Sequence, residues 1–339
     1  MMTHSPSAPE GGPQNAIESA VEPVPLNTWW GRHRVPPDRA DLWSIGPLDL
    51  LTERRENHWL FQWRYVWRNQ ELNSALRRLN VGTGFGSGFG TSFGSGSAGS
   101  RQTSSLVANQ QVRSAFSRYL EAKPESLAVP SLNPNEDLIF SPLMPDHALI
   151  LNARHPFTLA PGERLSTGFM IPLFLRVELA GSHTAGTSTL GRTVCELPLL
   201  PLTTTWVGPN PMQGEIALTS KQCLAIDQWK TYRPRLDAAA LSVHILNQTS
   251  KEFTVERVAI PCEQLSLHHS PQTGFWCENL TLETRNGFNG ITFITKIDRT
   301  MPKEAGSTNL VAKPRQVSEE PRSFRGLAEF RHLFGKEKP

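Results

Sequence analysis

Closely spaced cysteines are missing from this sequence. It holds only four cysteines, which form no C-x-x-C pair: Cys195, Cys223, Cys262 and Cys277. Zinc sites normally use such pairs, and small secreted disulfide scaffolds are denser in cysteine. His268 and His269 lie near the last two cysteines, but neighbouring side chains of a strand point to opposite faces and do not easily share an ion. We therefore expect free, buried thiols in a reducing compartment, with neither a metal site nor another cofactor.

Long apolar runs and targeting signals are also missing. The most apolar stretch, FMIPLFLRVELAG from Phe169, is interrupted by Pro172, Arg176 and Glu178. It is shorter than the roughly 20 residues that a membrane helix needs. The N-terminal stretch MMTHSPSAPEGGPQNAIESAVEP has neither the basic start nor the apolar segment of a signal peptide. We therefore expect a cytoplasmic protein that does not insert directly into a membrane.

Motifs that would name a chemistry are absent as well. No glycine-rich phosphate-binding motif opens a helix after a strand-like segment, and no G-x-S-x-G elbow joins a strand to a helix. Glu196 and Glu215 are isolated acids in strand-like surroundings. The net charge of +3 is too small to indicate the clustered basic face of a nucleic-acid-binding protein. These absences predict a non-enzymatic protein that does not bind nucleic acid.

What the sequence does have is a concentration of aromatic residues, with six of the nine tryptophans between Trp29 and Trp67. The stretch DLWSIGPLDLLTERRENHWLFQWRYVW predicts two strands joined by a polar turn at residues 54–57. From 59 to 67 every odd position is aromatic (WLFQWRYVW), which is the period of a strand with one aromatic face. Such a face either packs in the core or forms a stacking platform for a ligand, and the burial that each ring provides favours the core.

Short strand signals recur from Leu138 to Ile297 and are separated by Pro, Gly, Asn and Asp. They include HALILNA, LSVHILNQT, FTVERVAI and GITFITKI. Many short strands with frequent turns are typical of an antiparallel sandwich or barrel rather than of βαβ units. We therefore predict a mainly β protein with an antiparallel β-sandwich-like core, made of one large sandwich or two packed sandwiches, and with a small helical insertion and disordered tails.

Composition divides the chain into five parts. The predicted parts are a disordered tail over 1–23, the N-terminal strands of the β core over 24–68, a helical insertion over 69–125, the main β-rich domain over 126–300, and a linker with a C-terminal amphipathic helix over 301–339.

The predicted insertion combines helix-like and glycine-rich stretches. NQELNSALRRLN is helix-like, and VGTGFGSGFGTSFGSGSAGS carries no charge and eight of the 25 glycines. The glycine-rich part, residues 81–105, is either a flexible loop or a phenylalanine–glycine segment that binds partners weakly. The segment LVANQQVRSAFSRYLEAK then has apolar residues at helical spacing: Val112, Ala115, Phe116, Tyr119 and Leu120.

The C-terminal stretch PRSFRGLAEFRHLFGKEKP predicts a short helix capped by Ser323. Phe324, Leu327, Phe330 and Phe334 would share one broad side of it. Such a helix folds back onto its own domain, docks in a groove of a partner, or lies on a membrane surface. We predict these four residues as a partner-docking helix.

The stretch TTTWVGPNPMQGEIAL, residues 203–218, predicts a strand, a shaped turn and a second strand. The β-branched threonines favour a strand, and Trp206 is a large anchor. Gly208 would permit a turn conformation that is closed to other residues, and Gly214 would begin the second strand. We predict that Thr205, Trp206, Gly208, Gly214 and Glu215 form a ligand-binding or partner-binding site.

The run LTTTWVGPNPMQGEIAL resembles the most characteristic stretch of domain-of-unknown-function family 432, found in archaea and some bacteria. There a Thr-Trp-aromatic-Gly turn is followed by Gly-Glu and an apolar strand, whereas this chain has Val207 at the aromatic position. The resemblance extends over IGPLDLLTERRENHWLFQWR, HPFTLAPGERLSTGFMIPLFLRVEL and LSVHILNQTSKEFTVERVAIPCEQLSLHHSPQTGFWCENLTL, about two thirds of the chain. The family brings no established activity or catalytic residues. Its association with genes for small mechanosensitive-type channels implies a membrane-protein partner.

Two functions remain open at this point. The first is a non-enzymatic accessory or regulatory protein that binds a larger protein partner, such as a channel-type membrane complex, in the cytoplasm or at the inner membrane through that partner. The second is a small-ligand-binding or enzymatic β-sandwich with a pocket near Trp206 and Glu215. A third function, nucleic-acid binding, would need a salt-dependent affinity that the net charge gives no reason to expect.

Overall fold

The computed structural model describes most of the chain between Trp29 and Phe324. The described residues are 29–66, 124–133, 135–181, 191–210, 212–220, 225–226, 229, 232–287, 290–317 and 322–324. The predicted tail over 1–23, nearly all of the predicted insertion and the C-terminal stretch beyond Phe324 lie outside them.

Strands dominate the described residues, so the predicted mainly β fold is confirmed. The strands are β1 (Gly31–His33), β2 (Arg39–Ile45), β3 (Leu48–Arg54), β4 (His58–Tyr65), β5 (Glu125–Pro130), β6 (Glu136–Leu143), β7 (Leu149–Leu159), β8 (Arg164–Pro172), β9 (Phe174–Gly181), β10 (Arg192–Pro198), β11 (Thr203–Asn210), β12 (Gln213–Thr219), β13 (Ala225–Ile226), β14 (Ala238–Asn247), β15 (Phe253–Ile260), β16 (Leu267–Ser270), β17 (Gly274–Trp276), β18 (Asn279–Gly287), β19 (Gly290–Asp298), β20 (Asn309–Ala312) and β21 (Arg322–Phe324). Short 3-10 helices are η3 (Cys262–Gln264) and η4 (Lys303–Ala305). Within the described part of the chain, no helix has the length and apolar character to cross a membrane.

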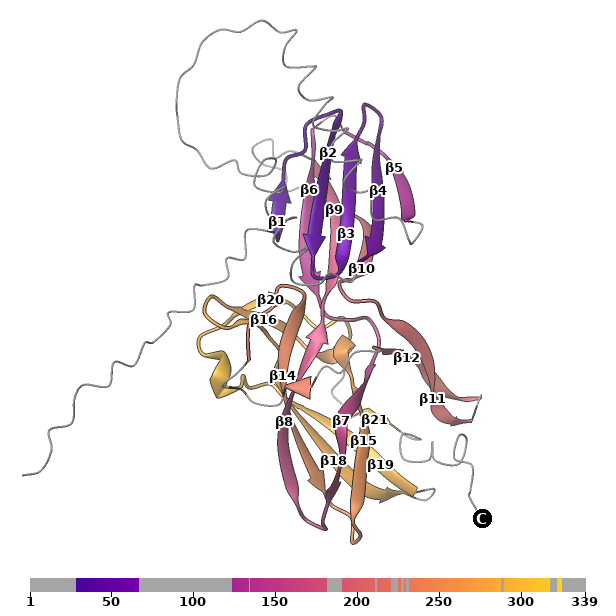
Figure 1. The fold of residues 1–339 in the computed structure, drawn as a ribbon, viewed down its shortest axis with the longest axis vertical. Helices are drawn as coiled ribbons and strands as arrows, with labels where there is room; N and C mark the ends of the chain where they lie inside the picture. The colour runs from indigo at the N-terminus through magenta and orange to yellow at the C-terminus, as the bar shows by residue number, and fades with distance from the viewer. Residues whose placement is uncertain are drawn as a thin grey trace, which may run out of the picture.

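The first of two packed sandwiches consists of two four-stranded antiparallel sheets. Sheet A has the strand order β1-β6-β9-β10, and sheet B has the order β2-β3-β4-β5. Figure 1 shows sheet B in front of sheet A in the upper half of the molecule. The aromatic strand is β4: Trp59 and Phe61 are fully buried between the sheets, and Trp63 and Tyr65 are half-buried. The core packing of these rings is therefore confirmed, and Trp67 lies outside the described residues.

Polar ends of the aromatic rings find partners on sheet A and its connections. Trp59 Nε1 donates a hydrogen bond to Glu136 Oε2 at 3.2 Å, and Arg54 stacks over the Trp59 ring at 5.4 Å. Tyr65 OH donates to the carbonyl of Pro198 at 2.6 Å. A buried indole or phenol needs such a partner, because an unpaired polar atom in the core is costly. These bonds fix how sheet B sits on sheet A.

The second sandwich is larger and mixes strand directions. Sheet C has the order β11-β12-β7-β15, and sheet D runs β20-β16-β17-β14-β18-β19-β21, with β8 paired to β14 and β13 paired to β8. The prediction of an antiparallel core needs one correction here, because β12 pairs with β7 in parallel and β14 pairs in parallel with both β17 and β18. Parallel neighbours require long connections, and the intervening strands provide them.

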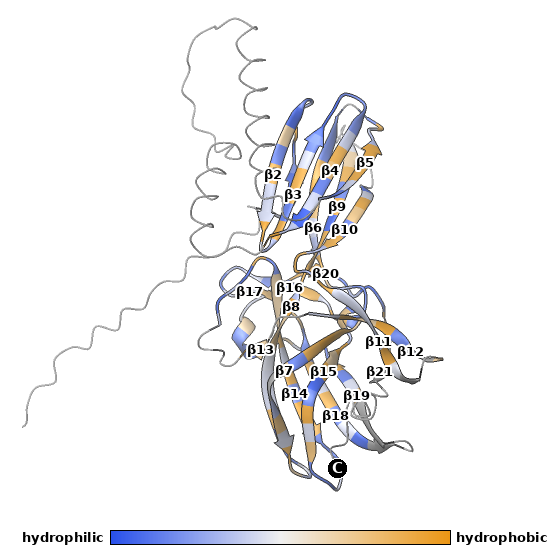
Figure 2. Ribbon diagram, turned by 45° about the vertical axis from the view of Figure 1, so that its right-hand side comes forward, coloured by the Kyte–Doolittle hydropathy of each residue, from blue (hydrophilic) through white to orange (hydrophobic). Residues whose placement is uncertain are grey.

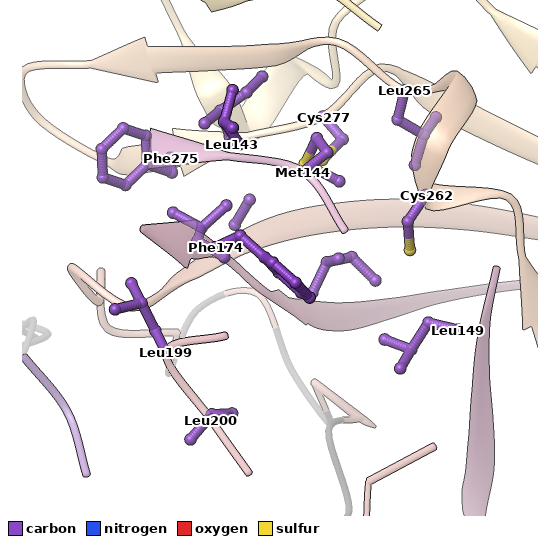
Figure 3. Close-up of a cluster of buried hydrophobic side chains, with 14 of the residues drawn as sticks. Leu143, Met144, Leu149, Phe174, Leu199, Leu200, Cys262, Leu265, Phe275 and Cys277 are labelled. Atoms are coloured by element: carbon purple, nitrogen blue, oxygen red, sulfur yellow. The ribbon is translucent and has the colours of Figure 1, made fainter. Parts of the chain in front are cut away.

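The chain passes between the two sandwiches after β6, between β8 and β9, and after β10. Leu173 is the single residue between β8 and β9; its N–H donates to the carbonyl of Asp237, and its own carbonyl accepts from Leu199. Apolar side chains from both sandwiches meet at these passages (Figure 3). The labelled members are Leu143, Met144, Leu149, Phe174, Leu199, Leu200, Cys262, Leu265, Phe275 and Cys277. The hydrophobic core is therefore continuous from one sandwich into the other.

A segment after β20 ties the second sandwich to the first. Arg315 Nε donates to the carbonyl of Met144 at 2.6 Å, and Nη1 donates to Glu196 Oε2 of β10 at 2.6 Å. The same guanidinium lies 5.8 Å from the centre of the Phe174 ring. Arg176 shares Glu196 by an ion pair of 2.9 Å. The planar fork of an arginine suits this multiple contact better than a lysine would.

Two expectations about local structure were wrong. The stretch predicted as two strands forms three, because a turn at Gly46 and Pro47 separates β2 from β3. Gly46 has φ +57°, and a Cβ there would collide with the Asp237 carboxylate of the second sandwich, so the turn requires glycine. Phe324 was expected in a helix capped by Ser323. Both instead belong to strand β21, which pairs with β19.

Candidate functional site

The predicted strand–turn–strand around Trp206 is a hairpin at the edge of sheet C. Strands β11 and β12 pair along most of their length, but β12 pairs with β7 only at Leu218 and Thr219. The rest of the hairpin therefore extends away from the sandwich, and Figure 1 shows it projecting to the right of the molecule. Three successive threonines begin β11, and their β-branched side chains favour an extended backbone.

A bulge, rather than a turn, occupies the position predicted for Gly208. The register shifts between Val207 and Asn210, so Gly208 and Pro209 together oppose the single residue Gly214. Proline has no N–H to give to the ladder and is tolerated at such bulges. Gly208 thus lies inside β11, and Asn210 and Gln213 form the last pair of the hairpin.

Gly214 is needed for the close approach of the Trp206 ring. A Cβ built on Gly214 would stand 2.7 Å from Cε2 and Nε1 of Trp206 and 2.5 Å from the carbonyl oxygen of Val207. These distances are far below van der Waals contact. The indole of one strand therefore lies across the bare backbone of the other, an arrangement in which an aromatic ring covers a strand glycine.

The two faces of the hairpin differ sharply in burial. On one face Val207 and Ala217 are 5% and 0% exposed and pack with Ala148, Ile150 and Ala259. This small cluster anchors the hairpin to the rest of sheet C.

The other face of the hairpin is open. Trp206 pairs across the strands with Ile216, and their exposed fractions are 44% and 51%. Met212 at the tip is 91% exposed. Leu218, two residues along β12 on the same face, is buried in the main core. The apolar face therefore continues out of the core onto the projecting hairpin, which leaves three large apolar side chains in contact with water.

The predicted site residues share the hairpin but do not converge. Because cross-strand partners lie on one face, Trp206 and Ile216 point one way, and Val207 and Glu215 point the other way. Thr205, paired with Ala217, lies on the face of Glu215. A single pocket lined by both the Trp206 and the Glu215 side chains does not fit this register. We call the Trp206, Met212 and Ile216 side chains the open apolar face.

The cysteine thiols, which could act as nucleophiles elsewhere, are buried or half-buried here. Burial raises the pKa of the Cys262 and Cys277 thiols well above the usual value, and the Cys277 thiol contacts Met144 Sδ at 3.6 Å. Burial, with the charge of Glu196 second, raises the pKa of Cys195 to about 12. These three cysteines are free, and their protonated thiols are poor nucleophiles. Cys223 lies outside the described residues.

The histidines of β16 do not form a metal site with their neighbours. His268 is half-buried, whereas His269 is buried and packs edge-on against Phe275 at 5.1 Å. Burial lowers the pKa of His269. In the part of the chain that the structure describes, no three side chains of His, Cys, Asp or Glu are arranged to hold a metal ion.

Sequence reasoning found the hairpin but missed part of its open face. Met212 and Ile216 were not among the predicted site residues. No signal in the sequence placed Ile216 on this face, because only the bulge at Gly208 and Pro209 brings it opposite Trp206. Of the predicted docking helix, Phe324 lies in β21, and Leu327, Phe330 and Phe334 lie outside the described residues.

Comparison with known proteins adds a family and nothing more specific. Neither the curated proteins nor the solved structures give a match. A family model described as "Protein of unknown function (DUF432)" matches residues 29–329, which include both sandwiches and the whole hairpin. The chain therefore belongs to this DUF432 family.

Proposed function

We propose that this protein is a non-enzymatic accessory protein that binds a larger protein partner through the open apolar face of the β11–β12 hairpin. The observation that carries the proposal is the exposure of Trp206, Met212 and Ile216 on an element whose other face is firmly packed. Contiguous exposed apolar side chains on a soluble protein are typical of interaction sites.

The anchoring of the hairpin supports a role in binding. Tryptophan dominates the energetics of many protein interfaces, and a rigid element loses little conformational freedom when a partner binds. Here Val207 and Ala217 are packed, and the Trp206 indole lies close against the backbone at Gly214. The open apolar face is therefore presented in a fixed geometry before any partner arrives.

The kind of partner follows only from the family resemblance. An association with genes for small mechanosensitive-type channels points to a channel-type membrane complex, with this chain on the cytoplasmic side of the inner membrane. Binding of the hairpin to such a complex would place the protein at the membrane through its partner.

Affinity capture at the native expression level, with quantitative mass spectrometry, tests the proposal. The wild type should recover a stoichiometric partner, and Trp206→Ala with Ile216→Ser should reduce its yield at least tenfold. Leu310→Ser, at a 53% exposed apolar position of β20, is the matched control and should keep the partner. Recovery of the untagged protein alone, or equal recovery by all variants, would reject the proposal.

Thermal-shift screening separates this function from small-ligand binding. Sugars, nucleotides and metal ions should leave the unfolding temperature unchanged, because Trp206 and Glu215 point to opposite faces. Saturable stabilisation by a small molecule, abolished by Trp206→Ala, would instead favour a ligand-binding or enzymatic role.

A further inference from the structure

Strand β11 turns some of its backbone groups away from the rest of the hairpin. The N–H of Leu218 in β12 donates to the carbonyl of Ala148 at 2.7 Å, so the backbone groups of Leu218 point towards β7. Thr204 is exposed and is the cross-strand partner of Leu218. Opposite residues of an antiparallel ladder exchange either both hydrogen bonds or neither. The N–H and C=O of Thr204 therefore point away from β12, at the outer edge of β11.

This outer edge is an edge of the whole sheet. Among the described residues, β11 is the last strand of sheet C, and no other strand pairs with its outer side. In both views of the molecule the hairpin projects beyond the other strands of sheet C (Figures 1 and 2). The row of N–H and C=O groups along such an edge is a template for one more strand.

The opposite edge of sheet C is protected in the way that is usual for edge strands. Strand β15 carries Glu256 and Arg257 at consecutive exposed positions, and a bulge interrupts its register between Val255 and Arg257. Charged side chains and bulges hinder the pairing of other chains with an edge. Strand β11 has no charged residue, and its bulge lies at the end next to the hairpin tip. The part Thr203–Val207 is therefore a regular strand that lacks both kinds of protection.

The side chains beside this edge indicate what kind of strand would fit it. Thr204 and Trp206 share the face of the hairpin that continues from the buried Leu218. A strand added to β11 would place every second side chain on this face, where the Trp206 ring is 44% exposed. Apolar side chains at those positions would cover the ring. The alternate positions would lie beside Thr205, where polar side chains fit.

We propose that the larger partner binds by adding an extended segment as a strand to the outer edge of β11, antiparallel to it, with apolar side chains at every second position. Main-chain hydrogen bonds to β11 contribute affinity, and the open apolar face selects the side chains. This inference rests on the proposed function, because it describes the form in which the partner meets the hairpin.

A fluorescent peptide of alternating valine and threonine, with a lysine at each end, tests strand addition to the full-length protein. Its valines would lie beside Trp206, and the backbone groups of the same valines would point at β11. N-methylation of the valine amides should weaken binding at least about tenfold in fluorescence anisotropy, whereas N-methylation of the threonine amides should leave binding unchanged. Equal affinities for the two methylated peptides, or no saturable binding of the unmethylated peptide, would overturn the proposal.

Thr204→Pro tests the same edge on the protein. Proline removes an N–H that points away from β12, and edge strands tolerate it there. The variant should bind the unmethylated peptide at least about tenfold more weakly, whereas Thr204→Val, which keeps the N–H, should bind it as the wild type does. Unchanged binding by Thr204→Pro would contradict strand addition. If this variant does not fold, as its unfolding temperature would show, the methylated peptides decide the question.

Affinity capture at the native expression level separates this inference from the proposed function. Thr204→Pro should lose the partner as Trp206→Ala with Ile216→Ser does, and Thr204→Val should keep it. If only Trp206→Ala with Ile216→Ser loses the partner, strand addition is wrong and the proposed function stands. If no variant loses the partner, both are rejected. A wild-type dimer that Thr204→Pro dissociates would assign the edge to a second copy of the chain and would also overturn the proposal.

Discussion

The outward faces of the two sheets of the first sandwich look alike in sequence but differ in the structure. Both carry charged residues at alternating positions. On sheet A, the side chains of Arg32 and Asp137 form an ion pair of 3.0 Å and remain 33% and 16% exposed. On sheet B, Asp49 and Arg64 occupy the corresponding outward positions with exposed fractions of 4% and 2%. Alternation of polar and apolar residues therefore identifies the two faces of a strand without showing whether the polar face meets water.

This difference changes what each charge contributes to stability. An exposed ion pair is screened by water and salt and contributes about 0–1 kcal/mol. A buried pair gains more from mutual attraction but pays a large desolvation cost, so that loss of one partner leaves a stranded charge. The contrast between the two faces can thus be tested by removing one charge from each.

The largest effect is expected for Asp49→Asn, compared with Asp137→Asn. Neutralising Asp49 removes the carboxylate that lies 3.7 Å from the buried Arg64 guanidinium and should lower the free energy of unfolding by about 3 kcal/mol. Neutralising Asp137 should cost at most about 1 kcal/mol. Urea denaturation of both variants at the same pH measures the two values. Equal losses would show that sheet B is as open as sheet A.

Leu51→Ala, compared with Ile139→Ala, should give the next largest difference. Removing the buried Leu51 side chain leaves a cavity beside Ala40 and Leu42 and should cost about 2–3 kcal/mol, whereas truncating the half-buried Ile139 should cost about 1 kcal/mol. The same denaturation experiment measures both.

The first sandwich also shows where prediction from sequence succeeds. The aromatic face of β4 was predictable. A strand places every second side chain on one face, so the five rings can be buried together only if the segment is a strand. The burial of Asp49, Glu53 and Arg64 was not predictable, because these residue types are typical of a solvated face. Tertiary packing, which the local pattern of a strand does not encode, decides whether such a face meets water.

The β11–β12 hairpin was partly predictable from its residue types. Threonines, prolines and glycines marked a strand, a reversal and a second strand. The bulge at Gly208 and Pro209 was not visible in the pattern, and one extra residue changes which side chains share a face. The bulge places the Trp206 and Glu215 side chains on opposite faces of the hairpin. Phe324 was placed in a helix by its spacing, but pairing with β19 outweighs that local preference.

The β11–β12 hairpin has a third kind of face, which is apolar but exposed to water. Gly214→Ala tests whether the close contact between Gly214 and Trp206 maintains this face. A methyl group at Gly214 would collide with the Trp206 ring and the Val207 carbonyl and should cost about 1–2 kcal/mol. Gly191→Ala is the control, since a Cβ there meets its nearest neighbour at an ordinary 3.4 Å. Tryptophan fluorescence should change only for Gly214→Ala. If both variants behave alike, Trp206 does not lie across Gly214.

The smallest effect concerns the inner face of sheet A, where His33 of β1 lies between Trp43 and Phe140 at ring distances of 4.6 Å and 5.3 Å. Burial lowers the pKa of His33, against the smaller raising effects of the hydrogen bond to the Trp29 carbonyl and of the Asp41 charge. The folded protein therefore binds the proton less readily than the unfolded chain does. The stability contributed by neutral His33 is complete above the unfolded value of 6.5 and is lost as pH falls through the lower folded pKa.

His33→Gln should therefore flatten the decline of unfolding free energy between about pH 7 and about pH 5. Urea denaturation across this range measures the slope, and His147→Gln, at a side chain 44% exposed, controls for the loss of a surface imidazole. The change should be smaller than that of any variant above, because one imidazole near a sandwich edge is only partly removed from water. An unchanged slope would mean that His33 meets water as freely in the folded state as in the unfolded chain. The inner face would then be open to water at the edge between β1 and β2.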